Sequence, residues 1–390
     1  MKIAIIKRKY MSEGGGGAER YARMIANGLI QKGHTIYILA KNFIGEESVN
    51  LIHIPVPSSH GINSSGNTAF HKSVQKILPK ERNKYNFDIV YSISRTYPSD
   101  IFRVTEQVHI EWMKLFYSSI QKMNPRHRGI LNLEKHIFQL KSTKAVVSNS
   151  QLVKDLVVKH YGFPAERIHV LRNGIDRSIF FPPTSPAEKQ KLRRDLISDT
   201  ITDNTIVLSF TSENFKIKGL DFAIQAISKL KPELQNKTLL AVLGGDNPAE
   251  FQKLADSLGV GNNITFLGRH KNPRNFYASA DLMLYPSMGE PFGNVCLEAC
   301  ACGVPVLTTE CNGSCEVVDP GKNGYIISSA SDVDKMTEYI NDFIRLDSVE
   351  KDDFSKNAVQ ATEPYSWDKH VDQLEKLIQE VRLEIYPPKL

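Results

Sequence analysis

Cysteine is scarce in this chain and is confined to one short stretch. All five cysteines lie between residues 296 and 315, beside an apolar helix-like and strand-like pattern. No two of them form the C-x2-C pair typical of zinc sites, and no histidine lies nearby. We therefore predict reduced thiols in a cytoplasmic protein, and no metal site.

Long apolar runs are also absent. The 390 residues are 41% hydrophobic and 24% charged, and no stretch is apolar for long enough to span a bilayer. The first residues, MKIAIIKRKY, gain charge too quickly for a signal peptide, so IAII is predicted to be a buried strand. These features indicate a globular protein with two domains of ordinary size.

Negative charge is sparse in the first half of the chain only. Residues 1–175 hold 26 Lys and Arg against 12 Asp and Glu (+14), whereas the remainder holds 23 against 31 (−8). A basic half implies an acidic partner, either an anionic membrane surface, a phosphorylated substrate or nucleic acid, unless it is only a solvated face. No nucleic-acid-binding motif accompanies the charge, so we expect no nucleic-acid partner.

Basic and bulky apolar residues are interleaved between residues 112 and 144. This composition suits a surface helix at an anionic interface. An ordinary amphipathic helix that buries its apolar stripe in the core fits the same pattern. Both readings stay open at the level of the sequence.

Strand-like and helix-like patterns alternate along the chain, which predicts α/β domains with parallel sheets. The first strand leads through four glycines, residues 14–17, into an amphipathic helix. Glycines at such a turn let a ligand approach the backbone, and the helix end favours negative charge. Glu19 replaces the third glycine of the dinucleotide fingerprint. A Pro-rich segment, residues 180–186, is predicted to link the two domains.

The stretch over residues 281–309 is the most informative. It has the pattern of a strand, a Gly-rich loop, a helix and a second strand. Glu290 lies in the loop, and Glu298 lies about two turns further on, so each carboxylate can face a different part of one ligand. The backbone N–H groups of residues 292–294 would offer donors to that ligand.

Other charged residues follow predicted strands. Lys216 and Lys218 flank a strand-to-helix turn, where an ammonium group would meet a phosphate or would only be solvated. The segment around residues 100–109 is expected to bring Asp100, Arg103, Glu106 and His109 together, with His109 at the end of a β-type segment. A lone histidine of this kind is more often structural than catalytic.

Several motifs together resemble one enzyme family. They are GGAER after the first strand, VLRNGID at the domain junction, the Lys218-Gly219 turn, and GEPFGNVCLEACACGVPVL with its Glu-x7-Glu spacing. Over nearly its whole length the chain resembles the family 4 retaining glycosyltransferases of the GT-B fold. Residues 212–227 and 242–269 look most like the branch that adds glucose to the heptose of the lipopolysaccharide inner core.

This resemblance implies an α/β architecture of the GT-B type, with two Rossmann-like domains that face each other across a cleft. Residues 1–178 would bind the acceptor, and residues 179–366 would bind the nucleotide sugar. The C-terminal helix, residues 367–390, would cross back and pack on the first domain.

The resemblance also implies roles for single residues. Glu290 and the backbone of residues 292–294 would hold the hydroxyl groups of the donor sugar, and Glu298 would bind the ribose. Lys218 would neutralise the diphosphate. His109 would lie at the sugar on its reacting side. The expected catalytic residues are therefore Glu290, His109 and Lys218.

One position departs from the family pattern. Many members have an arginine five residues before the lysine, and here that residue is Glu213, so Lys216 or Arg172 would take over at the diphosphate. The expected donor-binding residues are Gly16, Gly17, Arg172, Lys216, Lys218, Arg269, His270, Glu290, Phe292, Gly293, Asn294, Val295 and Glu298. The expected acceptor-binding residues are Asp100, Arg103, Glu106 and His109.

The implied reaction moves a hexose, glucose, from a UDP-sugar to a lipid-linked saccharide with retention of configuration and without a metal or other cofactor. The expected partners are the nucleotide sugar, an anionic glycolipid or lipopolysaccharide core, and an anionic membrane surface bound through the basic first domain. The protein would be cytoplasmic and peripheral to the inner membrane. A family 4 transferase for capsule, exopolysaccharide or another glycolipid, and a GT-B sugar-nucleotide epimerase, remain alternatives. A nucleotide-binding protein without catalysis has no positive feature in its favour.

Overall fold

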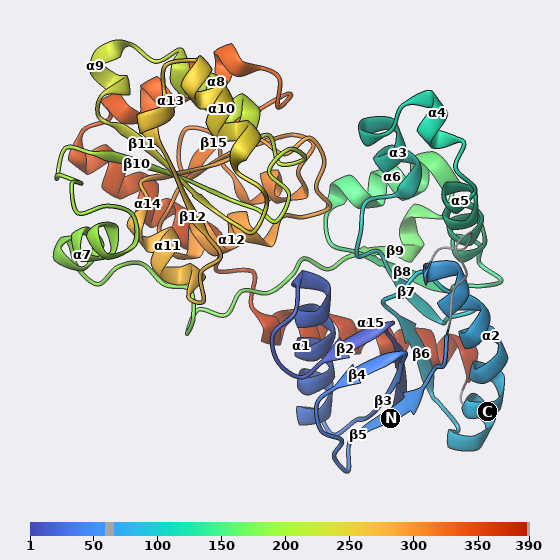
Figure 1. The fold of residues 1–390 in the computed structure, drawn as a ribbon. Coiled ribbons are helices and arrows are strands. Elements are labelled where there is room, and N and C mark those ends of the chain that lie inside the picture. The colour runs from blue at the N-terminus through green and yellow to red at the C-terminus, as the bar shows by residue number, and fades with distance from the viewer. Residues whose placement is uncertain (59–65, 388–390) are drawn as a thin grey trace. The chain divides into compact units, whose positions relative to one another are not determined.

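Apolar runs of the sequence form the strands of two parallel β-sheets, one in each of two units of the chain. The computed structural model describes residues 1–58 and 66–387. The first unit combines Met1–Gly174 with Tyr365–Leu390, and the second is Ile175–Pro364. Each unit is a parallel sheet covered by helices (Figure 1), which confirms the predicted pair of Rossmann-like α/β domains.

The sheet of the first unit has seven strands in the order β5-β3-β1-β6-β7-β8-β9, and a two-stranded sheet, β2-β4, lies beside it. Continuous apolar runs form these strands because a parallel sheet is buried on both faces. The strands are β1 Lys2–Ile6, β2 Lys9–Met11, β3 Thr35–Ala40, β4 Asn42–Ile44, β5 Leu51–Pro55, β6 Ile89–Ser92, β7 Ile101–Arg103, β8 Ala145–Ser148 and β9 Ile168–Val170. The helices are α1 Gly17–Gln31, α2 Gly66–Tyr85, α3 His109–Phe116, α4 Ser119–Lys122, α5 Pro125–Ile137, α6 Gln151–Tyr161, the 3-10 turn η1 Ala165–Arg167, and α15 Trp367–Ile385.

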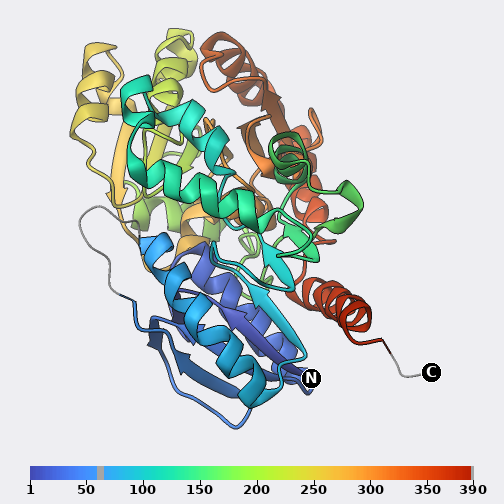
Figure 2. The same cartoon turned by 90° about the vertical axis from the view of Figure 1, so that its right-hand side faces the viewer.

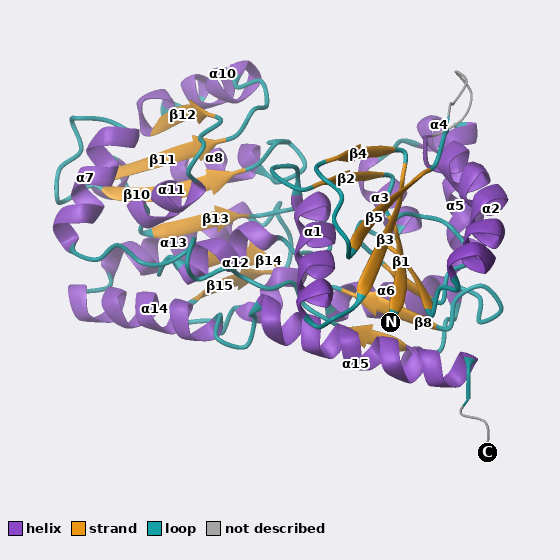
Figure 3. Cartoon of the chain, turned by 90° about the horizontal axis from the view of Figure 1, so that it is seen from below, coloured by secondary structure: helices purple, strands orange, loops and turns teal. Residues whose placement is uncertain are grey.

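Alternate residues of β1 face two different cores. Ile3 and Ile5 pack with α1 and α15, whereas Ala4 and Ile6 pack with α2 on the opposite face. Figure 2 shows α2 running across its face of the sheet. Helix α15 contacts α1 closely enough that a Cβ added at Gly28 would lie 2.6 Å from Val371 Cγ2, and Figure 3 shows α15 crossing at the lower end of α1. The C-terminal helix therefore packs on the first unit, as predicted.

The second unit has a six-stranded parallel sheet in the order β12-β11-β10-β13-β14-β15. Its strands are β10 Ile206–Thr211, β11 Thr238–Leu243, β12 Ile264–Gly268, β13 Leu282–Tyr285, β14 Val306–Thr309 and β15 Gly324–Ile327. Its α-helices are α7 Pro186–Leu196, α8 Leu220–Ser228, α9 Pro232–Gln235, α10 Ala249–Ser257, α11 Pro273–Ser279, α12 Asn294–Ala301, α13 Val333–Arg345 and α14 Ser348–Ala361, and the 3-10 turns are η2 Gly261–Asn263 and η3 Gly313–Val317.

The basic segment over residues 112–144 is not one helix. Ser118 caps α4, and Asn124 caps α5, whose first residue is Pro125, so α3, α4 and α5 are separate. Helix α5 turns its apolar side to the core, as one of the two predictions had it. Helix α4 and its end instead expose Ile120 (83%) and Met123 (67%).

In the part of the chain that the structure describes, no helix is both long and apolar enough to cross a membrane.

Candidate functional site

The loops after β10 and β13 pack tightly against each other at the carboxyl edge of the second sheet, the edge where open α/β sheets bind ligands. Gly219 has φ +79°, and a Cβ added there would lie 2.2 Å from the carbonyl oxygen of Pro286. The N–H of Met288 donates to the carbonyl of Ile217 at 3.1 Å. Only glycine fits this conformation and this contact, which explains the Lys-Gly turn of the sequence.

These loops bring Lys218 and Glu290 into an ion pair, although 72 residues separate them in the sequence. The side chains are 14% and 22% exposed, so the pair is partly shielded from water. The backbone of Glu290 is fixed as well, because its N–H donates to Cys311 (3.1 Å) and its carbonyl accepts from Gly313 (3.0 Å). The ammonium also lies 5.9 Å from the centre of the Tyr285 ring. An ammonium group and a carboxylate thus lie side by side where the loops after β10 and β13 meet.

Helix α12 begins just after this pair. Its N-cap Gly293 has φ +77°, and a Cβ there would lie 2.8 Å from Asn312 Oδ1. Asn312 is fully buried; its amide donates to Thr308 Oγ1 at 2.9 Å, and its carbonyl oxygen accepts from Ser314 N–H at 3.1 Å. The side chain of Phe292 is buried, while Asn294 and Val295, the first two residues of the helix, are partly exposed. Phe292, Gly293, Asn294 and Val295 therefore lie where the sequence predicted, around the N-terminus of a helix.

Glu298 lies on α12, is 5% exposed, and accepts a hydrogen bond from the hydroxyl of Tyr277 at 3.0 Å. Burial, together with this carboxylate, raises the pKa of Tyr277 well above its usual value, so Tyr277 stays a donor. The second glutamate is thus held in one orientation by a residue of α11. Glu290 and Glu298 occupy different surroundings, one in an ion pair with Lys218 and the other bonded to Tyr277.

The remaining charged residues expected at the donor site pair with neighbours. Lys216 Nζ lies 2.6 Å from Asp221 Oδ2 and its side chain is 63% exposed. Arg269 pairs with Glu213, with Nε 3.1 Å from both carboxylate oxygens, and its guanidinium lies over Gly245. His270 follows in the same loop, where Nδ1 contacts the backbone of Asn272. Glu213, five residues before Lys218, thus holds a guanidinium from the loop after β12.

The glycine turn of the first unit leads into α1. Gly16 is the N-cap and its N–H donates to the Glu19 carboxylate at 3.2 Å; Gly17 is the first residue of the helix. The other Glu19 oxygen lies 3.2 Å from the ammonium of Lys7, which follows β1. Arg172 follows β9, and its carbonyl accepts from His370 Nδ1 at 2.7 Å.

His109 is the first residue of α3, so the prediction that it ends a β-type segment is wrong. Its N–H donates to both oxygens of the Glu134 carboxylate, at 3.2 and 3.0 Å, and Nε2 lies 3.0 Å from His127 Nδ1. Burial, with Arg95 and His127 adding to it, lowers the pKa of His109 to about 4, so the ring is neutral at pH 7. A neutral imidazole can exchange hydrogen bonds with a sugar hydroxyl but carries no charge to offer a phosphate.

The four residues expected to bind the acceptor are not all together. Glu106 and His109 follow β7, and Arg95 reaches both sides of this region, with an ion pair to Glu106 and another to Glu134. Arg103, the last residue of β7, is buried and donates to Asn173 at 2.5 Å. Asp100 precedes β7, at the opposite edge of the sheet, where it pairs with Arg82 at 3.0 Å. The expected grouping is therefore wrong for Asp100.

Residue patterns gave no sign of three supporting residues. Tyr277 and Glu134 hold Glu298 and His109 through hydrogen bonds from 21 and 25 residues away in the sequence. Asn312, 19 residues after Gly293, occupies the space that a side chain at that glycine would need. The cysteines in and after α12 do not support these site residues. They are free thiols, and burial raises the pKa of Cys296 to about 12, as expected of a packing residue rather than a nucleophile.

Two α/β units, each with a parallel sheet, are typical of the GT-B fold. The Glu-x7-Glu pair and the Lys-Gly turn at the carboxyl edge of the second sheet identify a glycosyltransferase of that fold. Family models agree: residues 15–179 match "Glycosyltransferase Family 4", and residues 193–361 match "Glycosyl transferases group 1". The chain belongs to this family of glycosyltransferases.

Particular relatives can then be named. The chain is 27% identical over 328 residues, 83% of its own length and 85% of the relative's, to the lipopolysaccharide glucosyltransferase WaaG of Escherichia coli (strain K12). A crystal structure of WaaG superposes with a TM-score of 0.80 at 24% identity, covering 96% of this chain and 99% of that one. Anabaena Alr3699/HepE in complex with UDP-glucose superposes with a TM-score of 0.71 at 20% identity, covering 97% and 100%.

Proposed function

We propose that this protein is a retaining glucosyltransferase that uses UDP-glucose and an anionic, lipid-linked saccharide, the heptose of a lipopolysaccharide inner core. The relationship to the lipopolysaccharide glucosyltransferase WaaG over 83% of the chain carries this proposal. The complex of HepE with UDP-glucose supports a UDP-sugar as the donor. The excess of positive charge in residues 1–175 supports an anionic acceptor at an anionic membrane.

The arrangement around Glu290 suits the departure of a diphosphate. In the reaction, the bond from the anomeric carbon to the diphosphate oxygen breaks, and a bond from an acceptor hydroxyl oxygen to the same carbon forms. The hydroxyl proton passes to an oxygen of the leaving phosphate, on the face from which that phosphate departs. Lys218, beside the start of α12, would stabilise the negative charge that develops on this leaving group.

The two glutamates would then position the donor rather than exchange protons. Glu290 would accept hydroxyl groups of the glucose, and Glu298, held by Tyr277, would accept a ribose hydroxyl. Neutral His109 would contact the sugar on its reacting side. We propose no metal requirement, because these groups supply the charge that the leaving diphosphate needs.

A panel of UDP-, GDP- and ADP-sugars in a thermal-shift assay tests the donor, since a ligand that binds only the native state raises the melting temperature. UDP-glucose should give the largest shift. Transfer to a heptose-terminated core lipopolysaccharide, with the anomeric configuration of the product read by NMR, tests the acceptor and retention. Release of an altered sugar and free UDP without an acceptor would instead identify an epimerase, and EDTA should leave transfer unchanged.

A further inference from the structure

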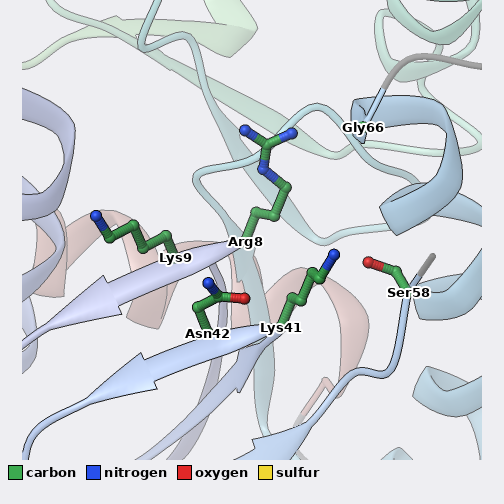
Figure 4. Close-up of a pocket in the computed structure, with 6 residues that line it drawn as sticks. All are labelled: Arg8, Lys9, Lys41, Asn42, Ser58 and Gly66. Carbon is green, nitrogen blue, oxygen red and sulfur yellow. The ribbon is translucent and has the colours of Figure 1, made fainter. Parts of the chain in front are cut away.

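A pocket at the carboxyl edge of the first sheet gathers positive charge. Its volume is about 390 Å³, within the range of about 300–1,000 Å³ common for small-molecule sites. It is lined by Arg8, Lys9, Lys41, Asn42, Ser58 and Gly66 (Figure 4). Every polar side chain in this lining is a hydrogen-bond donor or can act as one, and none is a carboxylate.

The backbone holds two of the cations side by side. Arg8 comes two residues after β1, and Lys41 comes directly after β3, its neighbour in the sheet. The carbonyl of Arg8 accepts the N–H groups of Lys41 and Asn42, both at 3.1 Å. Figure 4 shows the Lys41 ammonium extending toward the Ser58 hydroxyl and the Arg8 guanidinium rising toward Gly66, while Lys9 extends to the other side. A Cβ at Gly66 would lie 2.5 Å from Arg8 Nη1, so glycine leaves room for the guanidinium there.

The cations of this pocket have no ion-pair partner in the part of the chain that the structure describes. Among the described residues, no carboxylate forms an ion pair with Arg8, Lys9 or Lys41, and the guanidinium of Arg8 has only a 3.4 Å contact with Asn67 Oδ1. Lys7, next in the chain, does have such a partner in Glu19. Arg8 and Lys41 follow neighbouring strands, so two like charges are held close together, and their repulsion costs free energy. An anion in the pocket would remove that cost.

The pocket also lies within the electrostatic reach of a residue expected to contact the acceptor. Arg95 is the main cause that lowers the pKa of Glu106, and Lys7 and Arg8 add to it. Arg8 therefore acts both on the pocket and on the region of Glu106 that follows β7.

We propose that the pocket lined by Arg8 and Lys41 binds a phosphate group of the acceptor saccharide, and that it selects phosphorylated over unphosphorylated acceptors. The inference rests on the proposed function, because it assumes a saccharide acceptor. A guanidinium supplies paired donors to phosphate oxygens, and the ammonium, the Ser58 hydroxyl and the Asn42 amide complete the donor set.

The test uses a heptose-containing core oligosaccharide freed of lipid, with its phosphate groups and after their enzymatic removal. In the wild-type protein, the phosphorylated form should have a KM roughly tenfold lower or better, as expected for a lost charged hydrogen bond. The double variant Arg8→Gln/Lys41→Gln should lose this preference while kcat and the KM for the donor stay unchanged. Lys41→Arg should keep it. The control Lys76→Gln/Lys80→Gln removes the same charge from exposed positions of α2 and should keep the preference.

Four outcomes decide the matter. Loss of the preference in the double variant, and in Lys41→Gln alone with an unchanged melting temperature, upholds the proposal. A double variant that keeps the preference but loses binding to phosphatidylglycerol vesicles would show that the pocket takes a lipid headgroup, and the acceptor assignment would be overturned. If neither property changes while the wild type still transfers glucose, the pocket inference fails and the proposed function stands. A wild type that transfers glucose to neither saccharide would refute the proposed function. Even then, calorimetric binding of the phosphorylated oligosaccharide, absent in the double variant, would uphold the pocket.

Discussion

The ion pair between Lys218 and Glu290 leads to a prediction with opposite signs for its two members. If Lys218 binds the diphosphate, Lys218→Gln should weaken UDP binding. Glu290→Gln should not, because it frees the ammonium from its present partner. The free Lys218 would then bind the diphosphate at least as well as in the wild type.

The structure sets the expected size of these effects. A hydrogen bond to a charged group contributes about 1.5–3 kcal/mol, so losing the ammonium should cost about 2 kcal/mol, or roughly 30-fold in Kd. The full Coulomb energy of a close pair, about 4 kcal/mol at an effective dielectric constant of about 20, is an upper bound for two partly exposed side chains. In Lys218→Gln the remaining Glu290 carboxylate repels the diphosphate. The double variant should therefore regain about 1 kcal/mol, roughly fivefold in Kd.

Isothermal titration with UDP gives the four Kd values of this cycle, and steady-state transfer gives kcat. Glu290→Gln should lower kcat by about 100-fold, as expected when a positioning contact to the sugar is lost. Lys229→Gln is the matched control. Lys229 lies at the other end of α8, and the substitution breaks its exposed ion pair with Asp334 of α13. If Glu290→Gln weakens UDP binding as much as Lys218→Gln does, Glu290 itself contacts the nucleotide and the reasoning is refuted.

Three further predictions concern the two units. Burial lowers the pKa of His109 to about 4 from 6.5, so its contribution to stability is complete above about pH 6.5 and is lost as the pH falls toward 4. In urea unfolding, this residue should account for a loss of about 3 kcal/mol in the free energy of unfolding over that range. If the difference in free energy of unfolding between the wild type and His109→Gln does not change with pH, the prediction is contradicted. His370, lowered to about 3, adds to the same acid sensitivity of the first unit. Gly219→Ala should lower the melting temperature by several degrees and weaken UDP binding, because the added Cβ meets the Pro286 carbonyl at 2.2 Å; an unchanged melting curve would show that the turn can move. Glu298→Gln should raise the KM for the donor more than it lowers kcat, and the reverse result would place this residue at the sugar.

The alternation of strands and helices could be predicted because each element carries its own pattern, and the loop that holds Glu290 could be placed because its flanking strand and helix are apolar. Pairings between distant loops could not. Lys218 meets Glu290 only because β10 and β13 are neighbours in the sheet. His109 lies in a run that favours a strand, yet the Glu134 carboxylate, from another helix, accepts its N–H and begins α3 there. Arg269 was expected to bind the donor, and no local pattern shows that it pairs with Glu213.

The return of α15 to the first unit makes the second unit an insertion within the sequence of the first. The face of the first sheet that packs on α1 is completed by Val371 and Leu374, which a ribosome adds more than 300 residues after β1. Residues 175–364 are contiguous and can form their own core as soon as they emerge. The first unit must hold an open apolar face until synthesis reaches α15, so the order of folding during translation should be the reverse of the order of the two units in the chain.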